Sequence, residues 1–184
     1  MIRLWLCRHA PVLVEPGVCY GASDVPFDET ATQVAAKKIA TWLPKACVVW
    51  ASPSSRAAVF ARQLVQFRPD LNLAIDPRLA EADFGTWELK KWHDIPKTDL
   101  DTWVASFALY TPGGGESVYQ LMVRVTAALD HLQDLQVPEA LWVTHAGVIR
   151  AAQFMAIHGV RKLPEAQNWP DTPIPFGEPL PLDL

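Results

Sequence analysis

Ile2-Arg3-Leu4-Trp5-Leu6-Cys7 opens the chain as a short, largely apolar run, and the pair Arg8-His9 ends it. A run of this length is typical of a strand that is buried on both faces of a sheet. The abrupt change to polar residues predicts that the strand leaves the core at Arg8-His9. We therefore expect a buried first strand whose last residues reach the edge of the sheet.

Three later segments have the same strand-like character, and amphipathic helices alternate with them. The strands are expected over residues 46–51, 73–75 and 140–144, and four of the helices over residues 30–43, 100–107, 116–136 and 147–158. A fifth helix is expected to begin after Ser52-Pro53-Ser54, with serine as its N-cap. Buried strands that alternate with helices build parallel sheets with helices on both faces. The pattern predicts an α/β fold, a three-layer α/β/α sandwich around a mostly parallel central sheet.

The composition is that of a globular protein without an extended cationic surface. Half of the 184 residues are hydrophobic and a fifth are charged, so disorder is not expected. Sixteen Lys and Arg against 20 Asp and Glu give a net charge of −4. This balance lacks the positive field that holds a polyanion, so nucleic acid is not an expected partner.

The cysteines and the apolar segments argue against secretion and membrane insertion. Cys7, Cys19 and Cys47 are odd in number and irregularly spaced, so neither a disulfide framework nor a structural zinc site is expected. The first apolar run is shorter than the h-region of a signal peptide, and no window approaches the roughly 20 apolar residues of a membrane span. We expect a cytoplasmic protein without a membrane partner.

A chain of this length fits one core, so a single domain is expected over residues 1–184. Residues 86–112 interrupt the alternation of strands and helices and are expected to form a lid-like insertion. The segment 163–184 holds six of the 16 prolines and is expected to wrap around the domain in an extended, irregular conformation. The pattern leaves both a monomer and a homodimer open.

Polar residues follow three of the expected strands. Arg8-His9 ends the first strand, Ser52-Pro53 follows the second, and His145 follows the strand at 140–144. The carboxyl ends of parallel strands meet at one edge of a sheet, where ligands bind. A single histidine is more often structural than functional, but two at equivalent positions favour a shared function. Neither has the H-x-x-x-H or H-E-x-x-H spacing of a metal site, so no metal is expected.

Arg56 falls in the first turn of the helix after Ser54, and two interpretations are open. It is either a solvated arginine or part of an anion-binding site. A positive charge at this end of a helix opposes the helix dipole by roughly a few tenths of a kcal/mol unless an anion lies nearby. Together, Arg8 and Arg56 could form a clamp of two guanidinium groups, whose geometry suits a phosphate.

The segment Leu79-Ala80-Glu81-Ala82-Asp83-Phe84-Gly85-Thr86-Trp87-Glu88 mixes acidic and aromatic residues. A carboxyl group in a partly apolar wall retains its proton more readily and can donate it. Composition alone favours the plainer alternative, in which the aromatic residues are core and the acids are solvated. The glycines at 113–115 lack the Lys-Ser/Thr of a phosphate loop, and no G-x-G-x-x-G follows the first strand, so nucleotide-binding folds are not supported.

Six segments occur in an order that is typical of one enzyme family. Leu6-Cys7-Arg8-His9-Ala10 is similar to an Arg-His-Gly signature, and Ala51-Ser52-Pro53-Ser54-Ser55-Arg56-Ala57 is similar to an S-S-P-x-x-R-A segment. The other four are residues 17–27, 79–88, 112–117 and 143–150. Together they resemble the histidine phosphatase superfamily, which contains cofactor-dependent phosphoglycerate mutases and alpha-ribazole phosphatases. The resemblance spans roughly residues 2–160 and implies a phosphoglycerate mutase-like fold.

The resemblance implies covalent catalysis on a small phosphate ester, with no metal and no cofactor. His9 would attack phosphorus and become a phosphohistidine, while Arg8, Arg56 and His145 stabilise the charge of the phosphoryl oxygens. Glu81 would protonate the leaving alkoxide and then take a proton from the attacking water. The residues implied to bind the substrate are Arg8, Arg56, His145, Ala146, Tyr20, Gly21 and Ser23.

The chain departs from the family pattern at four positions. Ala10 and Ala146 replace glycines and are expected to be tolerated because both are small. Leu89 stands where a glycine often follows Trp-Glu, and Glu15 stands where many members have an asparagine that contacts phosphate. A carboxylate beside a phosphate would repel it, so we expect the loop at 11–21 to be arranged differently. The identity of the substrate stays open.

Several functions are compatible with these motifs. A phosphomonoesterase nearest to the alpha-ribazole phosphatases is favoured, because 184 residues leave little room for the segments with which mutases exclude water. The alternatives are a cofactor-dependent phosphoglycerate mutase, a phosphohistidine phosphatase and a phospholigand-binding protein without turnover. Two interpretations are open for Trp87, Trp92, Trp103 and Tyr20. They either stack on a ring of the leaving group or pack in the core or the lid.

Overall fold

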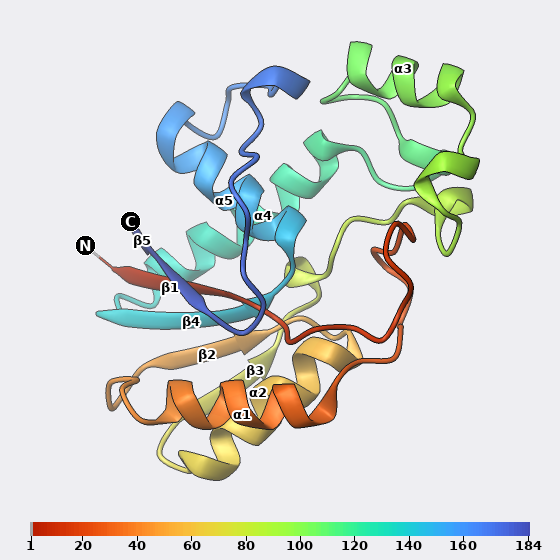
Figure 1. Ribbon diagram of the computed structural model, residues 1–184. Helices are drawn as coiled ribbons and strands as arrows, with labels where there is room; N and C mark the ends of the chain where they lie inside the picture. Colours follow the sequence, from red (N-terminus) through yellow and green to blue (C-terminus); the bar gives the residue numbers. More distant parts are fainter. Residues whose placement is uncertain (1) are drawn as a thin grey trace.

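The computed structural model describes residues 2–184, and in this part of the chain five strands form one sheet (Figure 1). The strands are β1 (Arg3–Arg8), β2 (Val48–Ala51), β3 (Asn72–Ile75), β4 (Glu139–Thr144) and β5 (Pro179–Asp183). They are ordered β3-β2-β4-β1-β5, with β5 antiparallel to β1 and all other neighbours parallel. The mostly parallel sheet predicted from the sequence is confirmed.

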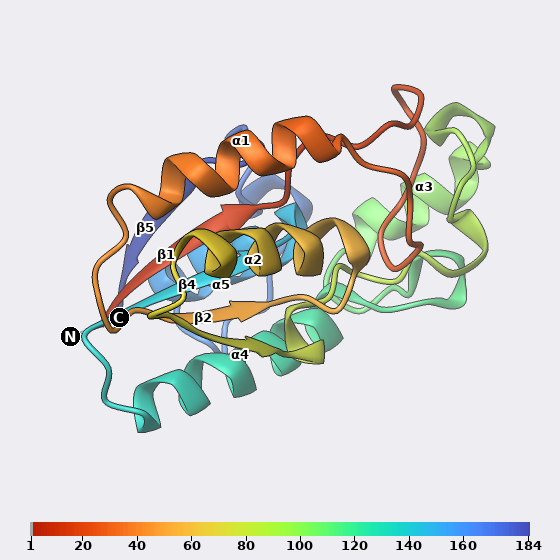
Figure 2. The ribbon, with the colours of Figure 1, turned by 90° about the horizontal axis from the view of Figure 1, so that it is seen from below.

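Helices cover both faces of the sheet (Figure 2). One face carries α1 (Glu29–Ala40) and α2 (Ser55–Phe67), and the other carries α4 (Val118–Asp134) and α5 (Ala146–His158). Alternate residues of β4 serve the two cores: Trp142 packs on the side of α4 and α5, while Leu141 and Val143 pack on the side of α1 and α2. The predicted three-layer sandwich is therefore confirmed.

The register of the parallel strands brings their carboxyl ends together. The backbone N–H groups of His9 and Ser52 continue the ladder by donating to the carbonyl oxygens of Thr144 and Val143, both over 3.0 Å. His145 follows Thr144 directly. The predicted rim of polar residues is confirmed, because these side chains leave the sheet at the same edge.

The start of α2 is capped differently from the prediction. Ser54 is the N-cap residue, but its side chain makes no capping hydrogen bond. Instead, the carboxylate of Asp24 accepts hydrogen bonds from the backbone N–H of Ser55 (3.0 Å) and from its hydroxyl (2.7 Å). A carboxylate at this position also suits the positive end of the helix dipole. The loop before α1 is thereby tied to the start of α2.

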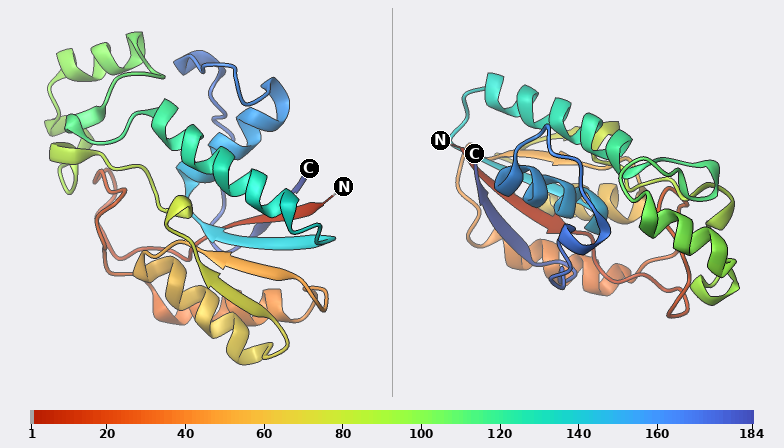
Figure 3. Two further views of the ribbon diagram at one scale, coloured as in Figure 1. Left: turned by 180° about the vertical axis from the view of Figure 1, so that it is seen from behind. Right: turned by 90° about the horizontal axis from the view of Figure 1, so that it is seen from above.

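Residues 86–112 lie beyond the carboxyl ends of the strands, beside the loop at residues 11–24 (Figure 3). The two segments share backbone hydrogen bonds, including one in each direction between Cys19 and residues 89–90, both 2.8 Å. A small core of their own forms around Trp87. The short helices of the chain are η1 (Pro77–Leu79), η2 (Gly85–Trp87), η3 (Trp92–Asp94), α3 (Lys97–Ala105), η4 (Pro112–Gly114) and η5 (Ala166–Asn168).

The C-terminal segment ends in a strand, so the prediction of an irregular tail is wrong for β5. Ile2 and Leu184 exchange both backbone hydrogen bonds, at 3.0 and 2.9 Å. Because hydrogen bonding alternates along a strand, Pro179 and Pro181 fall at positions whose N–H would point away from β1. Prolines are tolerated at such positions of an edge strand. Their number hid the strand from sequence-based reasoning.

Candidate active site

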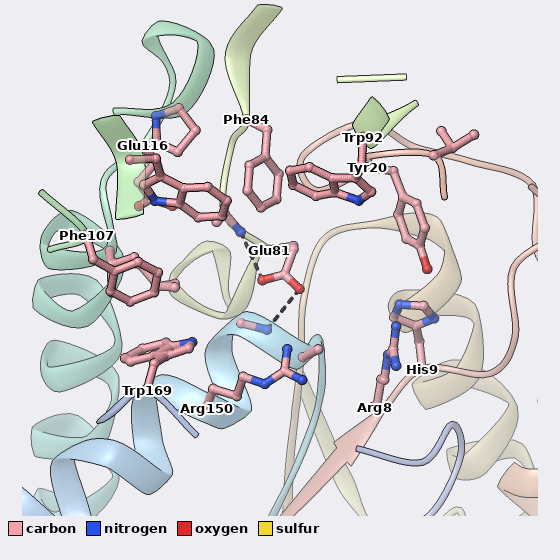
Figure 4. A pocket seen from close by; sticks show the side chains of 18 residues that line it. Arg8, His9, Tyr20, Glu81, Phe84, Trp92, Phe107, Glu116, Arg150 and Trp169 are labelled. Carbon is pink, nitrogen blue, oxygen red and sulfur yellow. Dashed lines mark hydrogen bonds between the residues drawn. The ribbon is translucent and has the colours of Figure 1, made fainter. Parts of the chain in front are cut away.

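A pocket of about 400 Å³ opens at the carboxyl ends of the strands (Figure 4). One side is polar and comes from the strand ends and α5, while the other is largely aromatic and comes from residues 84–107 and the C-terminal segment. The lining includes Arg8, His9, Tyr20, Glu81, Phe84, Trp92, Trp103, Phe107, Glu116, Ala146, Arg150 and Trp169. A concave, mostly apolar cavity with a few convergent polar groups is the usual form of a small-molecule site.

His9 is buried, with 1% of its surface exposed, and its two ring nitrogens have different partners. Nδ1 lies 2.7 Å from the carbonyl oxygen of Ala10. Because a carbonyl oxygen only accepts hydrogen bonds, Nδ1 carries the proton and Nε2 presents its lone pair. The guanidinium of Arg56 donates to this lone pair through Nε, over 3.3 Å. Nε2 is therefore the nucleophilic atom of the ring.

Both histidines at the strand ends are held neutral. Burial is the largest cause that lowers the pKa of His9 to about 3, and the charges of Arg56 and Arg8 add to it, against the opposing effect of the Ala10 hydrogen bond. Burial likewise lowers the pKa of His145 well below its ordinary value. A neutral imidazole at physiological pH has the lone pair that a nucleophile needs.

Arg56 is fully buried, so the interpretation of a solvated first-turn arginine is wrong. Its terminal nitrogens donate to the carbonyl oxygens of Gly21 (2.6 Å) and Ser23 (2.9 Å). A guanidinium that spans two carbonyls is held rigidly, and its charge stays beside His9. Gly21 and Ser23, which the resemblance implies as substrate-binding residues, contact Arg56, and neither is among the residues that line the pocket.

Glu88 holds the same loop from its other side. The carboxylate accepts hydrogen bonds from the backbone N–H groups of Gly21, Ala22 and Ser23 over 3.0 to 3.2 Å, and from that of Phe84 over 2.9 Å. Burial acts to raise the pKa of Glu88, but these hydrogen bonds hold it below its ordinary value. No spacing rule in the sequence connects Glu88 with a loop 67 residues away, so sequence-based reasoning missed it.

Arg8 is held by the C-terminal segment. Its Nη1 donates to the carbonyl oxygen of Ile174 (3.2 Å), and its guanidinium carbon lies 3.7 Å from the centre of the Phe176 ring. The same ring lies 5.6 Å from that of His9. The backbone N–H of Gly177 donates to the carbonyl oxygen of Arg8 over 2.9 Å. The last residues of the chain thus orient a side chain at the end of β1.

His145 lies beside His9, with ring centres 5.1 Å apart. Its Nε2 shares a 2.7 Å hydrogen bond with the hydroxyl of Ser52. Its Nδ1 is buried and has no partner within residues 2–184. His145 itself is not among the lining residues, whereas Ala146, the next residue, is.

Glu81 lines the pocket and is oriented by two backbone N–H groups (Figure 4). Oε1 accepts from Ala82 and Oε2 from Gly147 at the start of α5, both over 3.0 Å. A Cβ atom at residue 147 would lie 2.3 Å from Oε1, so a larger residue there would displace the Glu81 carboxylate from this position. Glu81 is half-buried, and the alternative of a simply solvated acid is wrong for it.

Two of the departures from the family pattern have a structural explanation. Glu15 forms an ion pair with Lys91 (2.9 Å) and does not line the pocket, so its carboxylate does not oppose a phosphate there. Val18 and Lys91 form a β-bridge that holds this loop in place. Leu89 has a φ of 64°, in the left-handed region that favours glycine, which explains why glycine is common at this position.

Five aromatic side chains form a continuous surface that we call the aromatic wall: Phe84, Trp92, Trp103, Phe107 and Trp169. Successive rings in this order have centres 5.6 to 6.1 Å apart. Of the rings considered for stacking, Tyr20 also lines the pocket, whereas Trp87 is buried and belongs to the core. Sequence-based reasoning did not place Phe107 or Trp169 here, because nothing in their surroundings points to a shared surface.

Arg150 is a further lining residue that had no role in the sequence analysis. It lies on α5, four residues after Ala146, so the two share a helix face. This spacing could have found it. Arg150 adds a second guanidinium group to the pocket besides that of Arg8.

Within residues 2–184, no group of three or more His, Cys, Asp or Glu side chains is placed to share a metal ion. In that range no helix is both long and apolar enough to cross a membrane. Cys7, Cys19 and Cys47 are free and buried.

Residues 4–168 match the family model of the histidine phosphatase superfamily (branch 1). The chain belongs to the histidine phosphatase superfamily. It is 29% identical over 177 residues to the adenosylcobalamin/alpha-ribazole phosphatase of Salmonella typhimurium LT2, a match that covers 91% of this chain and 84% of that protein. The enzyme of the same name in Escherichia coli K12 is 28% identical over 155 residues, covering 80% and 75%.

A solved structure of the same family is also similar in fold. The crystal structure of the alpha-ribazole phosphatase from Shigella flexneri superimposes with a TM-score of 0.71 and 26% identity, covering 84% of this chain and 80% of that one. The resemblance drawn from the sequence is confirmed. This histidine phosphatase is similar to enzymes of the alpha-ribazole phosphatase type, and it is itself a phosphatase.

Proposed function

We propose that this histidine phosphatase hydrolyses small phosphate monoesters without a metal ion, through a phosphohistidine intermediate at His9. One observation carries the proposal: His9 is neutral, with Nδ1–H bound to Ala10 and the Nε2 lone pair beside the guanidinium of Arg56. A buried neutral ring among fixed positive charges suits attack on a dianionic phosphoryl group.

In the first step, Nε2 of His9 attacks phosphorus and the ester P–O bond breaks. The electron pair of that bond goes to the leaving oxygen, which takes a proton from Glu81. The hydrogen bond from Arg56 to Nε2 passes to a phosphoryl oxygen when the substrate binds. Arg8, Arg56 and His145 stabilise the charge on the phosphoryl oxygens in the transition state.

In the second step, water attacks the phosphohistidine and the P–N bond breaks. Glu81, now a carboxylate, takes the proton of the water, and the electron pair returns to Nε2. The phosphorylated ring is cationic because Nδ1 keeps its proton, and the carbonyl oxygen of Ala10 stabilises that charge. The N–H groups of Ala82 and Gly147 hold Glu81 in one orientation through both proton transfers.

The leaving group faces the aromatic wall in this proposal. Flat rings pack against such a surface with their edges or faces, and Tyr20 and Ala146 add contacts near the phosphate. The names of the curated relatives make alpha-ribazole phosphate the reference ester. We assign Gly21 and Ser23 the task of positioning Arg56, because their carbonyl oxygens bind it.

The proposal is tested by hydrolysis of p-nitrophenyl phosphate in excess EDTA. Wild-type protein is expected to turn over, and His9→Asn to lose roughly 1,000-fold or more, because no other group replaces the nucleophile. His93→Asn is the matched control, since His93 is exposed outside the pocket. It is expected to retain wild-type activity.

Each contrary result has a defined meaning. If the activity of His9→Asn is within about tenfold of that of wild type, the reaction does not pass through a phosphohistidine at His9. Wild-type activity that needs an added divalent metal would contradict the metal-free mechanism. Phosphoryl transfer between bisphosphoglycerate and phosphoglycerate that outpaces hydrolysis would make the protein a mutase, and tight binding of a phosphate ester without turnover would make it a binding protein.

A further inference from the structure

Arg150 is a pocket cation that the proposed mechanism does not use. It is half-buried, and its Nε is shielded from solvent without a hydrogen-bond partner in the described chain. No ion pair or side-chain hydrogen bond involves Arg150 among residues 2–184. The Nε–H of Arg150 is therefore buried without an acceptor, while its terminal nitrogens stay accessible from the pocket, so an anion in the pocket would find a guanidinium group that no protein group has paired.

The acids of the same pocket are already engaged. Glu116 makes a two-pronged ion pair with Arg124, with N–O distances of 2.7 and 2.8 Å. Glu81 accepts hydrogen bonds from two backbone N–H groups. Neither carboxylate forms an ion pair with Arg150 in the described chain.

Positive charges repel each other inside this cavity. Burial is the main cause that lowers the pKa of Arg8; Tyr20 and Glu81 act against it, and the charge of Arg150 lowers the pKa by a smaller amount. The two guanidinium groups therefore sense each other across the pocket. A ligand with two separate negative charges would satisfy both, whereas a single phosphate held by Arg8 and His9 leaves Arg150 unpaired.

The position of Arg150 is on the leaving-group side. Figure 4 shows its guanidinium beneath Glu81, with Trp169 on one side and Arg8 and His9 on the other. In the proposed mechanism Glu81 protonates the leaving oxygen. A group beside Glu81 and next to the aromatic wall therefore meets the leaving group before it meets the transferred phosphoryl group.

We propose that Arg150 binds a second anionic group, a carboxylate or a phosphate, on the leaving group of the substrate. The enzyme then prefers esters whose leaving group combines a ring with a negative charge. This inference rests on the proposed phosphatase function of the same pocket. It makes Arg150 a specificity-determining residue, and a neutral leaving group such as that of alpha-ribazole phosphate would use only part of the pocket.

The test compares two isosteric substrates that differ in one charge. Carboxyphenyl phosphate and carbamoylphenyl phosphate, each as the 3- and the 4-isomer, are assayed with wild type, Arg150→Met and Arg150→Lys. The readout is the ratio of kcat/KM for the carboxylate to kcat/KM for the amide. Each variant is assayed with the same two esters, so the difference in intrinsic reactivity between the esters cancels when the ratios of wild type and variant are compared.

Wild type is expected to prefer the carboxylate ester over the amide ester for at least one isomer. Arg150→Met should lower the ratio of the two kcat/KM values roughly tenfold to a hundredfold, as expected for the loss of a charge-assisted hydrogen bond. Arg150→Lys should keep part of the preference, because it keeps the charge but not the fork. Arg62→Met, exposed on α2, removes the same charge elsewhere and should keep the wild-type ratio. Thermal unfolding of each variant shows that it is folded.

The outcomes separate this inference from the proposed function. A wild-type enzyme that hydrolyses neither ester contradicts the phosphatase proposal itself. Hydrolysis of both esters with the same ratio in wild type and Arg150→Met overturns the role of Arg150 alone. Equal losses on both esters would place Arg150 on the transferred phosphoryl group and would also overturn the inference.

Discussion

The pocket has two sides that are built by different means. One is the histidine–arginine cluster at the strand ends, in which Arg8 and His9 line the pocket. Its other members, Arg56 in the first turn of α2 and His145 after β4, contact His9 but are not lining residues. Apart from Arg8, its members are at most 1% exposed, and each has a hydrogen-bond partner. The other is the aromatic wall, which comes from loops, short helices and the C-terminal segment, and whose members are half-buried.

The contrast separates chemistry from specificity. The register of the sheet places His9 and His145 in the cluster, and hydrogen bonds to fixed backbone carbonyls orient Arg56 and Arg8. The wall is held by apolar packing of its rings against one another and against side chains such as Ile95 and Leu100. The indole N–H of Trp103 is buried without a partner in the described residues. Substitutions in the cluster should therefore affect all esters, and substitutions in the wall should affect some esters more than others.

Arg56→Gln should have the largest effect, because this change removes the donor to His9 and the two bonds to Gly21 and Ser23. We expect kcat/KM for p-nitrophenyl phosphate to fall roughly 100-fold or more, as for loss of a preorganised donor at developing charge. Arg62→Gln, exposed on the same helix, is the control. A folded Arg56→Gln within about threefold of wild type would place Arg56 outside the active site.

The burial of His9 makes stability depend on pH. The pKa is about 3 in the folded protein and 6.5 without burial, so between these values the unfolded chain binds one more proton. The free energy of unfolding therefore falls as the pH drops below 6.5, by about 1.4 kcal/mol per unit for this group. Urea unfolding at pH 7 and pH 5 should show about 2 kcal/mol less loss in His9→Asn than in wild type. Equal losses would contradict a ring held neutral by burial.

Phe176 links the C-terminal segment to the cluster through its contact with Arg8. Phe176→Leu should weaken competitive inhibition by inorganic phosphate about tenfold, because a half-buried cation–π contact is lost while the volume is largely kept. Phe67→Leu, on the exposed side of α2, is the control. An unchanged inhibition constant would show that Arg8 is oriented without the ring.

The aromatic wall should give the smallest effect. Trp103→Leu is expected to lower the preference for phenyl phosphate over ethyl phosphate about threefold to tenfold, because an aromatic contact is lost. Trp42→Leu, which is partly exposed and outside the pocket, is the control. If both esters lose activity equally, the wall also shapes the cluster, and the separation of the two sides is wrong.

The cluster could be predicted from the sequence and most of the wall could not, for a physical reason. Strand ends are marked by an abrupt change from apolar to polar residues, and parallel strands bring those ends together, so His9 and His145 could be placed on one rim. The same argument cannot place Phe107 or Trp169, because the paths of long loops and tails depend on contacts between residues far apart in sequence.

The support of the cluster was also beyond the sequence. Glu88 acts on a loop 67 residues away, and Phe176 reaches Arg8 from the other end of the chain. The strand β5 was not predicted because of Pro179 and Pro181. Their backbone nitrogens face away from β1, so the missing N–H groups cost no hydrogen bond of the sheet. In each case the residues can be read in the sequence, but the segment that they contact is determined by the tertiary fold.

The central claim is that His9 carries the phosphoryl group, and trapping the intermediate tests it most directly. Wild type and Glu81→Gln are mixed with p-nitrophenyl phosphate, quenched in alkali and digested for mass spectrometry. A good leaving group needs little help from Glu81, whereas hydrolysis of the intermediate needs its base, so the variant should accumulate the phosphorylated form. We predict an acid-labile, base-stable phosphoryl group on the peptide that contains His9. Turnover without that label, or a label on His145 or a hydroxyl residue instead, would contradict the account.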